Sequence, residues 1–431
     1  MNKRKYEVIK LVIGVILIVA VSVGIFTSLF LARYVMFNDG ELLPNGEFMI
    51  CQYEIIRQDD PSQTGREDAI FFVNEQGEIT NYIGEPDVQL DQPHEAVLLP
   101  NGNILVANCR NDTILEINVT TKTVNWTFDL RELDWSSVDA SFTASNYVNN
   151  PSGDDWSHVN DVDYINDTGT EYLLISVRNF DMVFEIDYTT SKSRNYTFEG
   201  DITWWFGFPG DHTKLNHQHN TDYVDNETIL VADSENGRIV EINKSSKTII
   251  WESPESLDLY WVRDVDLNPL DSNILLVTDS LHHRVIEYNR LSSEIIWEYT
   301  GKMIQPYQAD YNGNNTGQVI ISDGVGGRVF IVDKSTNTII REYQTSHGSY
   351  LSMMVIFLLL LVLPVADLII KAYESHKWPE QRKKKNKKIK FWTNTCISIG
   401  LCVFLIWLIF DPQWLMKLLV VIIDNLVRSN Q

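Results

Sequence analysis

The sequence predicts an all-β protein, a six-bladed β-propeller with flanking transmembrane helices. Strand-like segments alternate with polar turns over about residues 47 to 343, and no convincing amphipathic helix interrupts them. Similar segments recur at a spacing of about 40 to 65 residues, with several strands in each, which is typical of propeller blades. Long apolar stretches occur only near the two ends of the chain.

The apolar stretches predict three membrane-spanning helices, at residues 11–34, 349–370 and 391–410. The first has no charged residue from Leu11 to Ala32. A cleaved signal peptide is the alternative, but its apolar core is usually shorter and ends at a small-residue cleavage site. We therefore expect an uncleaved anchor.

Basic residues predict the orientation of these helices. Four lie in residues 1–10 and seven in residues 382–390 of the loop 371–390, and both segments are expected in the cytoplasm. A nucleic-acid patch is the rival interpretation of the basic loop. Residues 35–46 are expected to be a linker, and residues 47–346 an extracellular propeller. Residues 411–431 have apolar side chains at helical spacing and predict an amphipathic helix on the outer membrane face. The sequence thus predicts a multi-pass protein of the cell membrane that contacts lipid through three helices.

The expected outer part is strongly acidic. Residues 40–347 contain 19 Lys and Arg against 51 Asp and Glu, a net charge of −32, whereas the whole chain carries −23. This charge argues against nucleic acid as a partner. It also means that an anionic substrate would need a local positive pocket.

Glycosylation sequons and cysteines fit an extracellular location without proving it. The sequons all lie in the expected outer part, at Asn111, Asn118, Asn125, Asn166, Asn195, Asn226, Asn243 and Asn314. Cys51 and Cys109 either form a disulfide or remain two buried thiols. The sequence leaves the oligomeric state undetermined.

Three late segments carry the repeat most clearly. Each consists of a strand, a tight polar turn and a second strand, at residues 229–243, 274–289 and 319–333. Each continues into a third strand that contains Ile-Ile, at Thr248–Trp251, Glu294–Trp297 and Thr338–Arg341. Looser units precede them, and the six blades are expected to start near residues 47, 92, 156, 217, 261 and 305. Two stacked β-sandwiches are the alternative, which such similar repeats disfavour.

Alignment of the innermost strands predicts two rings of side chains in the central channel. Both consist mainly of polar and aromatic residues, unlike a purely structural closure. The first ring comprises His94, Asn160, His219, Arg263 and Tyr307. The second lies two residues earlier, on the same face of an extended strand, and comprises Gln92, His158, His217, Trp261 and Gln305. Arg178 and Arg110 end later strands of two of these blades and are expected at the same mouth.

This set of residues suits the transfer of an anionic group. A neutral imidazole is a nucleophile, cationic donors stabilise an oxyanion, and histidine shuttles protons near neutral pH. A single polar channel residue usually only binds water, but histidines from three blades are less easily incidental. The chemical rival is a transition-metal site with His94, His158, His217 and His219 as ligands.

Two motifs resemble the arylsulfotransferases that do not use a nucleotide sulfate donor. Asp155-Trp-Ser-His-Val-Asn160, followed by Leu174-Ile-Ser-Val-Arg178, resembles that family's Trp-x-His-x-Asn and Ser-x-Arg pattern. Trp204-Trp-Phe-Gly207, followed by Asn216-His-Gln-His219, is similar to its second motif. The resemblance covers about residues 90 to 345 and implies a six-bladed propeller that works outside the cytoplasmic membrane.

The resemblance also implies roles for the ring residues. His219 would attack the sulfur of an aryl sulfate and carry the sulfuryl group to a phenolic or other hydroxyl acceptor. His158, Arg178 and His94 would hold the sulfate oxygens and the leaving phenolate, with Asn160 as an orienting donor. His217, Arg263 and Tyr307 are expected to contact the substrate, and no cofactor is expected. His217 departs from the family pattern, as do the flanking membrane helices.

A hypothesis of another class is a non-catalytic, membrane-tethered propeller that binds glycans or a protein partner. Such a protein would form no sulfated histidine. The histidine- and arginine-lined channel favours the enzyme, because a purely interacting propeller has no need of it.

Overall fold

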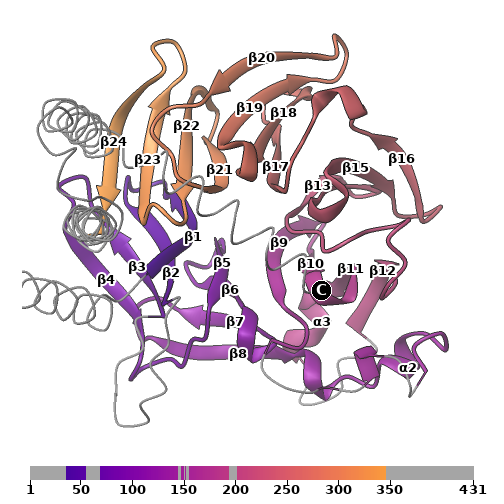
Figure 1. The fold of residues 1–431 in the computed structure, drawn as a ribbon. Helices are drawn as coiled ribbons and strands as arrows, with labels where there is room; N and C mark the ends of the chain where they lie inside the picture. The colour runs from indigo at the N-terminus through magenta and orange to yellow at the C-terminus, as the bar shows by residue number, and fades with distance from the viewer. Residues whose placement is uncertain are drawn as a thin grey trace, which may run out of the picture. The chain divides into compact units, whose positions relative to one another are not determined.

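Six four-stranded antiparallel sheets are arranged around a central axis, as Figure 1 shows. The computed structural model describes residues 35–54, 68–143, 147–149, 151, 155–193 and 201–345. In each sheet, four strands that follow one another in the sequence pair in that order. The predicted six-bladed propeller is therefore confirmed.

Blades one to three contain the first twelve strands. Blade one comprises β1 (Val35–Leu42), β2 (Phe48–Glu54), β3 (Ala69–Val73) and β4 (Ile79–Gly84). Blade two comprises β5 (Pro93–Leu98), β6 (Ile104–Asn108), β7 (Thr113–Asn118) and β8 (Thr123–Asp129). Blade three comprises β9 (Val159–Asp167), β10 (Thr170–Val177), β11 (Met182–Asp187) and β12 (Ile202–Gly207), with the short helices α2 (Trp135–Val138) before it and α3 (Tyr188–Ser193) inside it.

Blades four to six follow the late repeats closely. Blade four comprises β13 (Thr221–Asp225), β14 (Thr228–Asp233), β15 (Arg238–Asn243) and β16 (Thr248–Glu252). Blade five comprises β17 (Val262–Asn268), β18 (Asp271–Asp279), β19 (Arg284–Asn289) and β20 (Glu294–Tyr299). Blade six comprises β21 (Pro306–Asn312), β22 (Asn315–Asp323), β23 (Arg328–Asp333) and β24 (Thr338–Gln344).

The predicted linker 35–46 is wrong, because its first part is the innermost strand of blade one. Strand β1 pairs with β2 from Val35 opposite Glu54 to Leu42 opposite Phe48. Its sequence contains Asn38, Asp39, Gly40 and Glu41, so it lacks the apolar alternation of an ordinary strand. Innermost strands border a polar channel, and a polar sequence is therefore compatible with a strand at this place.

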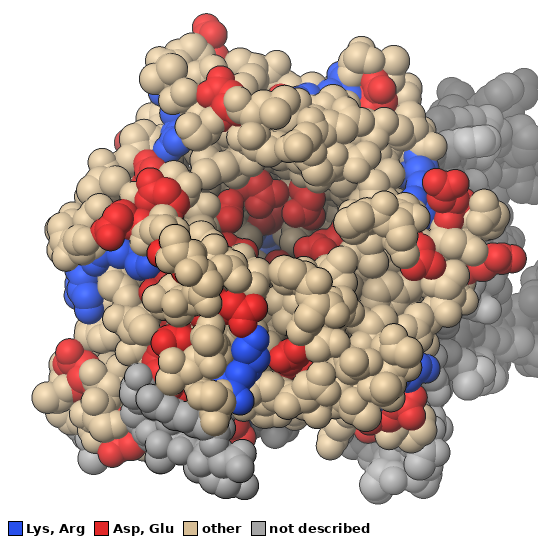
Figure 2. Space-filling model, turned by 180° about the vertical axis from the view of Figure 1, so that it is seen from behind, with Lys and Arg blue, Asp and Glu red and all other residues tan. Residues whose placement is uncertain are grey.

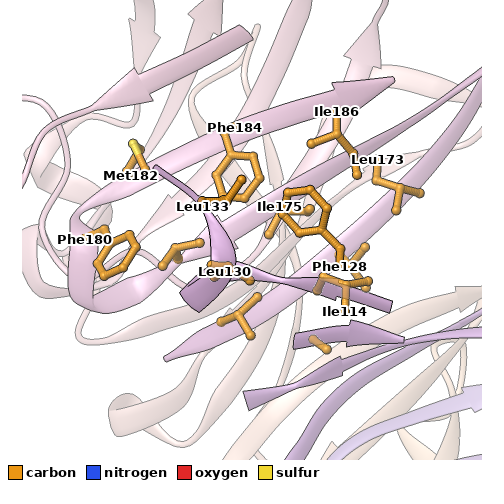
Figure 3. Close-up of a cluster of buried hydrophobic side chains, with 14 of the residues drawn as sticks. Ile114, Phe128, Leu130, Leu133, Leu173, Ile175, Phe180, Met182, Phe184 and Ile186 are labelled. Atoms are coloured by element: carbon orange, nitrogen blue, oxygen red, sulfur yellow. The ribbon is translucent and has the colours of Figure 1, made fainter. Parts of the chain in front are cut away.

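The core consists of six clusters of apolar side chains, one between each pair of neighbouring blades. The largest, between blades two and three, contains Ile114, Phe128, Ile175, Phe184 and Ile186 (Figure 3). Blades one and six share a cluster of the same kind, which contains Phe37, Phe71 and Val329. The ring is therefore closed by side-chain packing between whole blades, not by a strand shared between the two ends of the domain.

An Asp–Arg pair fixes the repeated turn between the second and third strands of the late blades. Asp279 ends β18, and its Oδ2 accepts from Arg284 Nε at 2.7 Å. The other oxygen accepts from Tyr260 N at 2.8 Å, just before the innermost strand begins. Asp233 and Asp323 make the corresponding bonds in blades four and six. The repeat seen in the sequence thus also anchors the chain that enters the channel.

No helix in these described ranges is long and apolar enough to span a membrane. The three predicted spans, the basic loop and the C-terminal amphipathic helix all lie outside the described residues.

Candidate active site

The first-ring residues stand where the innermost strands are irregular. In five blades the ladder between the first two strands shifts register at or beside the ring position, as between Pro93 and Glu95 in blade two and between Val262 and Asp264 in blade five. A β-bulge places two residues opposite one and re-aims a side chain. The bulge therefore lets two successive residues border the channel, and one pocket contains both His94 and Glu95, and both Arg263 and Asp264.

Three imidazoles and a phenol ring cluster here: His94, His219 and Tyr307 line this pocket, and His158 adjoins His94. The ring centroids of His94 and His219 are 4.7 Å apart, and those of His94 and His158 are 5.9 Å apart. Tyr307 lies 6.3 Å from His219 and 6.5 Å from His94. Blades two, three, four and six thus converge on one point, as the alignment predicted.

Arg263 brings a positive charge to the same point. Its Cζ lies 3.8 Å from the centroid of the Tyr307 ring and 4.1 Å from that of Trp261. The side chain is buried, and its Nε has no hydrogen-bond partner. A guanidinium that is held by aromatic rings and keeps a free donor is suited to an anionic oxygen.

All three clustered histidines are kept neutral. Burial lowers the pKa of His219, and the charge of Arg263 lowers it further. Burial and the neighbouring His158 lower the pKa of His94 in the same way. Burial also lowers the pKa of His158, against the opposing effect of Asp155. At neutral pH each ring therefore keeps a lone pair, and Nε2 of His219 is buried without a partner.

Asp155 orients His158, a role that the motif analysis missed. His158 Nδ1 lies 2.7 Å from Asp155 Oδ1. Burial alone would raise the pKa of Asp155, but the hydrogen bond and charge of His158, with Arg110 and Arg178, bring it below the usual value. The carboxylate therefore accepts from Nδ1–H and leaves Nε2 of His158 as the basic nitrogen. The signal was present in the sequence, because Asp155 opens the quoted motif.

The residues of the predicted second ring do not lie on extended strands. Gln92, His158, His217 and Trp261 all have left-handed backbone, with φ between 46° and 59°, and they precede their strands. The period of two does not apply through such a residue. His158 still reaches the cluster, but the His217 ring lies 6.3 Å from that of His212, and its backbone N–H donates to Asp181 Oδ1 at 2.8 Å.

His217 differs from His219 in its surroundings as well. It is only partly buried, and burial with the charge of Arg178 lowers its pKa to about 4. Left-handed backbone at a non-glycine residue carries strain and often marks functional sites. His217 thus lies outside the histidine cluster, and its contact with substrate stays a prediction.

Arg178 lies near the cluster, at the end of β10. Its charge contributes to the lowered pKa of His94, His217 and His219, and Nη1 donates to Asn179 Oδ1 at 2.9 Å. Burial and the charge of Arg263 lower its own pKa. An anion bound near both guanidinium groups would relieve their mutual repulsion.

Asn160 and Gln218 hold the His219 segment instead of facing a substrate. Asn160 Nδ2 donates to the carbonyl oxygen of Gln218 at 3.1 Å. Gln218 Nε2 in turn donates to Met182 O at 2.8 Å and Ser176 Oγ at 3.1 Å. The amide that was predicted to orient the substrate is thus engaged with the backbone beside His219, which makes Asn160 a positioning residue.

The other motif residues are structural. Trp156 is buried and packs on Phe180 with ring centroids 4.8 Å apart. Gly207 has φ 102°, and a Cβ there would lie 2.1 Å from Asp181 O, so only glycine fits. Cys51 and Cys109 are both buried free thiols, which corresponds to the second of the two expectations for them.

Sequence reasoning missed the contribution of blade one. Asn38 stands at the bulge of β1 and lines the same pocket as His94 and His219. It escaped notice because its strand was interpreted as a linker.

A metal site with four histidine ligands is not what the geometry offers. Among the described residues, the only three potential ligand atoms within 4.8 Å of one another belong to Cys109, Asp155 and His158. In that group the shortest contact is the hydrogen bond between His158 and Asp155. The positive charges of Arg110 and Arg178 help to lower the pKa of Asp155.

Comparison with known proteins agrees with the motifs. Residues 84–238 match the family model described as arylsulfotransferase (ASST). This segment belongs to the arylsulfotransferase family. It runs from the end of blade one to the start of β15 and includes His94, Asp155, His158, Arg178 and His219. Arylsulfotransferase membership supports a sulfotransferase activity in general terms, and with it the binding of a sulfate donor and an acceptor.

Solved structures that resemble this chain include two lyases. Virginiamycin B lyase from Staphylococcus aureus is 14% identical, with a TM-score of 0.43, and the match covers 71% of this chain and 83% of the lyase. A streptogramin B lyase is 12% identical, with a TM-score of 0.46 and coverage of 73% and 85%. No curated protein matches the chain.

Proposed function

We propose that this chain transfers a sulfuryl group from an aryl sulfate ester to a phenolic or other hydroxyl acceptor, through a sulfohistidine at His219 and without a nucleotide sulfate donor. The observation that carries the proposal is the neutral, unpartnered imidazole of His219 in contact range of His94, Tyr307 and Arg263. A protonated imidazole would have no lone pair for attack on sulfur.

In the first half-reaction the His219 lone pair attacks the sulfur of the ester. A nitrogen–sulfur bond forms as the bond from sulfur to the aryl oxygen breaks, and the phenolate leaves with the electron pair. Arg263 and Arg178 stabilise the charge on the sulfuryl oxygens and the leaving oxygen. The Tyr307 hydroxyl is a further donor, and the aromatic faces of Trp261 and Tyr307 beside Arg263 suit an aryl group.

In the second half-reaction the acceptor hydroxyl attacks the sulfur of sulfohistidine. His158 takes the hydroxyl proton on Nε2, while Asp155 accepts from Nδ1–H and stabilises the imidazolium that forms. The oxygen–sulfur bond forms, the nitrogen–sulfur bond breaks, and His219 regains its lone pair. Donor and acceptor thus use the same pocket in turn, in a ping-pong exchange.

We also propose that the propeller lies outside the cell, anchored by helices at residues 11–34, 349–370 and 391–410. The apolar stretches and their basic flanks support this arrangement. Of the eight sequons, seven fall on described residues, and none of these asparagines is buried. Glycans at those positions would meet no steric obstacle from burial of the asparagine.

The proposal is tested by transfer from 4-nitrophenyl sulfate to phenol, without added nucleotide, in the full-length chain and in two variants. His219→Ala removes the nucleophile and is expected to abolish transfer. His217→Ala is the matched control, since it removes an imidazole two residues away that lies outside the cluster. The His217→Ala variant is expected to form the sulfohistidine as the wild type does.

Intact-mass measurement after incubation with donor alone gives an independent readout. The wild type and His217→Ala should carry one sulfuryl adduct that maps to His219. Transfer that survives in His219→Ala, or an adduct on another histidine, would contradict the assignment. A wild type that gains no adduct and transfers nothing would favour the non-catalytic, glycan- or protein-binding propeller.

A further inference from the structure

The channel continues beyond the histidine cluster as a corridor of carboxylates. The innermost strands contribute nine, which we call the acidic channel: Asp39, Glu41, Glu95, Asp161, Asp163, Asp222, Asp264, Asp266 and Asp310. Figure 2 shows a hollow at the centre of the propeller with Asp and Glu side chains on its wall. The sulfotransferase chemistry uses none of them.

The acidic channel lacks basic partners. No Lys or Arg forms an ion pair with any of the nine carboxylates in the described part of the chain. Burial raises the pKa of all nine, and mutual repulsion adds to it for most, as when Asp310 acts on Asp39 and Asp264. Uncompensated buried charges are costly, so the channel must hold either protons or cations.

The carboxylates nearest the histidine cluster are rigidly held by one oxygen only. Asp264 Oδ2 accepts from Ala309 N at 2.8 Å, and Asp39 Oδ2 accepts from Ala96 N at 3.1 Å. Asp161 Oδ2 accepts from Thr221 N at 2.7 Å. In each case the donor is the innermost strand of the next blade, so these side chains cannot swing away from the channel.

Oxygen atoms without partners are left over in the same place. Asn38 is 3% exposed, its Nδ2 donates to Pro93 O at 3.2 Å, and its Oδ1 has no partner. This neutral amide oxygen lines one pocket with Glu95, Asp264 and Gln308. Oδ1 of Asp39 is also buried without a partner. An amide oxygen needs a donor or a cation, and ionised carboxylates beside it attract a cation.

We propose that the acidic channel binds a hard divalent cation of the Ca²⁺ class, held by oxygens of Asp39, Asn38, Glu95, Asp161 and Asp264. Such cations prefer carboxylate and amide oxygens to nitrogen or sulfur. No three carboxylates of the described channel place oxygens within 4.8 Å of one another. The cation therefore keeps water between itself and part of the ring, as Ca²⁺ sites allow.

The cation would lie directly beneath the sulfuryl pocket, since Glu95 and Asp264 follow His94 and Arg263 in the sequence and share their pocket. It would offset the negative charge that otherwise repels an aryl sulfate. The site itself does not depend on the proposed function, and its test does not use sulfuryl transfer.

The test is a titration of the full-length, chelator-treated chain with CaCl₂. Binding is measured by calorimetry and by the shift of the melting temperature, and NaCl at matched ionic strength is the reference. We expect saturable binding, and a Tm rise of about 2–5 °C at roughly a hundredfold excess over Kd. Because the carboxylates give up protons to bind the cation, the heat should depend on the ionisation enthalpy of the buffer.

Two variants locate the site. Asp264→Asn keeps an oxygen for Ala309 N but removes one charge, and should weaken Ca²⁺ binding at least tenfold. Glu294→Gln removes an exposed carboxylate from β20 and should leave it unchanged. Equal affinity in both variants, or no calcium-specific heat in the wild type, would overturn the proposal. Should Asp264→Asn fail to fold, Asp161→Asn decides in the same way, since it keeps the acceptor for Thr221 N.

Discussion

At the scale of single residues, burial and positive charge act in the same direction on the imidazole of His219, and both lower its pKa. Arg263 lowers the pKa of His219 and is also the group expected to bind the anionic oxygens. Its guanidinium is held between Trp261 and Tyr307 and needs little further ordering. One residue thus helps to keep the proposed nucleophile neutral and offers a positive charge to an anion.

Asp155→Asn tests the orientation of His158. The amide can still accept from Nδ1–H, but it no longer stabilises the imidazolium, so the pKa of His158 should fall. We expect kcat to fall by about 10–100-fold with little change in KM, and the ascending limb of the kcat pH profile to move to lower pH. The measurement is a pH series with 4-nitrophenyl sulfate. An unmoved limb would show that Asp155 has only a structural role.

Arg263→Lys tests the anion-binding role while it keeps the charge. Lysine loses the planar stacking on Tyr307 and the second donor, so kcat/KM for the aryl sulfate should fall by about tenfold or more. Arg290→Lys is the matched control, because Arg290 pairs with Glu241 at 2.8 Å and stacks on Trp251 away from the channel. Equal effects of both substitutions would contradict the role.

At the scale of elements, irregular strands build the site. In five blades a bulge at or beside the ring position turns two successive side chains toward the channel, as in blade two, where His94 joins the histidine cluster and Glu95 the acidic channel. The left-handed backbone of His158, just before its strand, then brings its ring beside that of His94. Regular strands would present only every second residue.

Asp279→Ala tests the repeated turn that anchors the entry to an innermost strand. Asp279 is fully buried, and its removal leaves Arg284 and Tyr260 N without their partner. We expect the free energy of unfolding to fall by about 3–5 kcal/mol, the range for removal of one partner of a buried ion pair. The measurement is urea denaturation.

Glu298→Ala is the internal comparison for that variant. Glu298 pairs with the same Arg284 at 3.7 Å, but its side chain is 44% exposed. The free energy of unfolding of Glu298→Ala should therefore fall by less than about 1 kcal/mol. A similar loss in both variants would mean that the turn does not depend on the buried carboxylate.

At the scale of the whole molecule, the propeller places a positive and a negative zone on one axis. The domain is strongly acidic, and many of its carboxylates line the channel that the blades enclose. The histidine cluster is the local exception, because the charges of Arg263 and Arg178 act on His219 and those of Arg110 and Arg178 act on Asp155. An anion bound in this domain is therefore restricted to one depth of the channel.

The acidic channel predicts how stability depends on pH in the absence of metal. Burial and the charge of Asp222 raise the pKa of Asp310 to about 7. The folded state thus binds this proton more tightly than the unfolded chain, so the contribution is present at low pH and is lost as pH rises through about 7. Compared with Asp310→Asn, the wild type should lose up to about 1.4 kcal/mol per pH unit between about pH 4 and 7.

Denaturation of both proteins in chelator across that range measures the difference. Glu294→Gln, on the exposed outer strand, should follow the wild type. A wild type whose stability does not fall relative to Asp310→Asn would show that Asp310 titrates as it does in the unfolded chain.

The sequence by itself determined the propeller and most of the site. Near-identical repeats fixed the blades, because each must bury the same faces against its neighbours, and the aligned positions of His94, His219, Arg263 and Tyr307 converge as predicted. The family match agrees with the motifs over residues 84–238. The expected membrane helices stay predictions.

Only the tertiary structure decided what depends on bulges, left-handed residues and ring closure. It placed Asn38 in the pocket, because β1 is a strand by virtue of its partners and not of its own pattern. It assigned Asn160 to the support of His219 and Asp155 to His158. It also stacked carboxylates from the innermost strands into one channel, since side chains far apart in sequence meet only where the ring of blades closes.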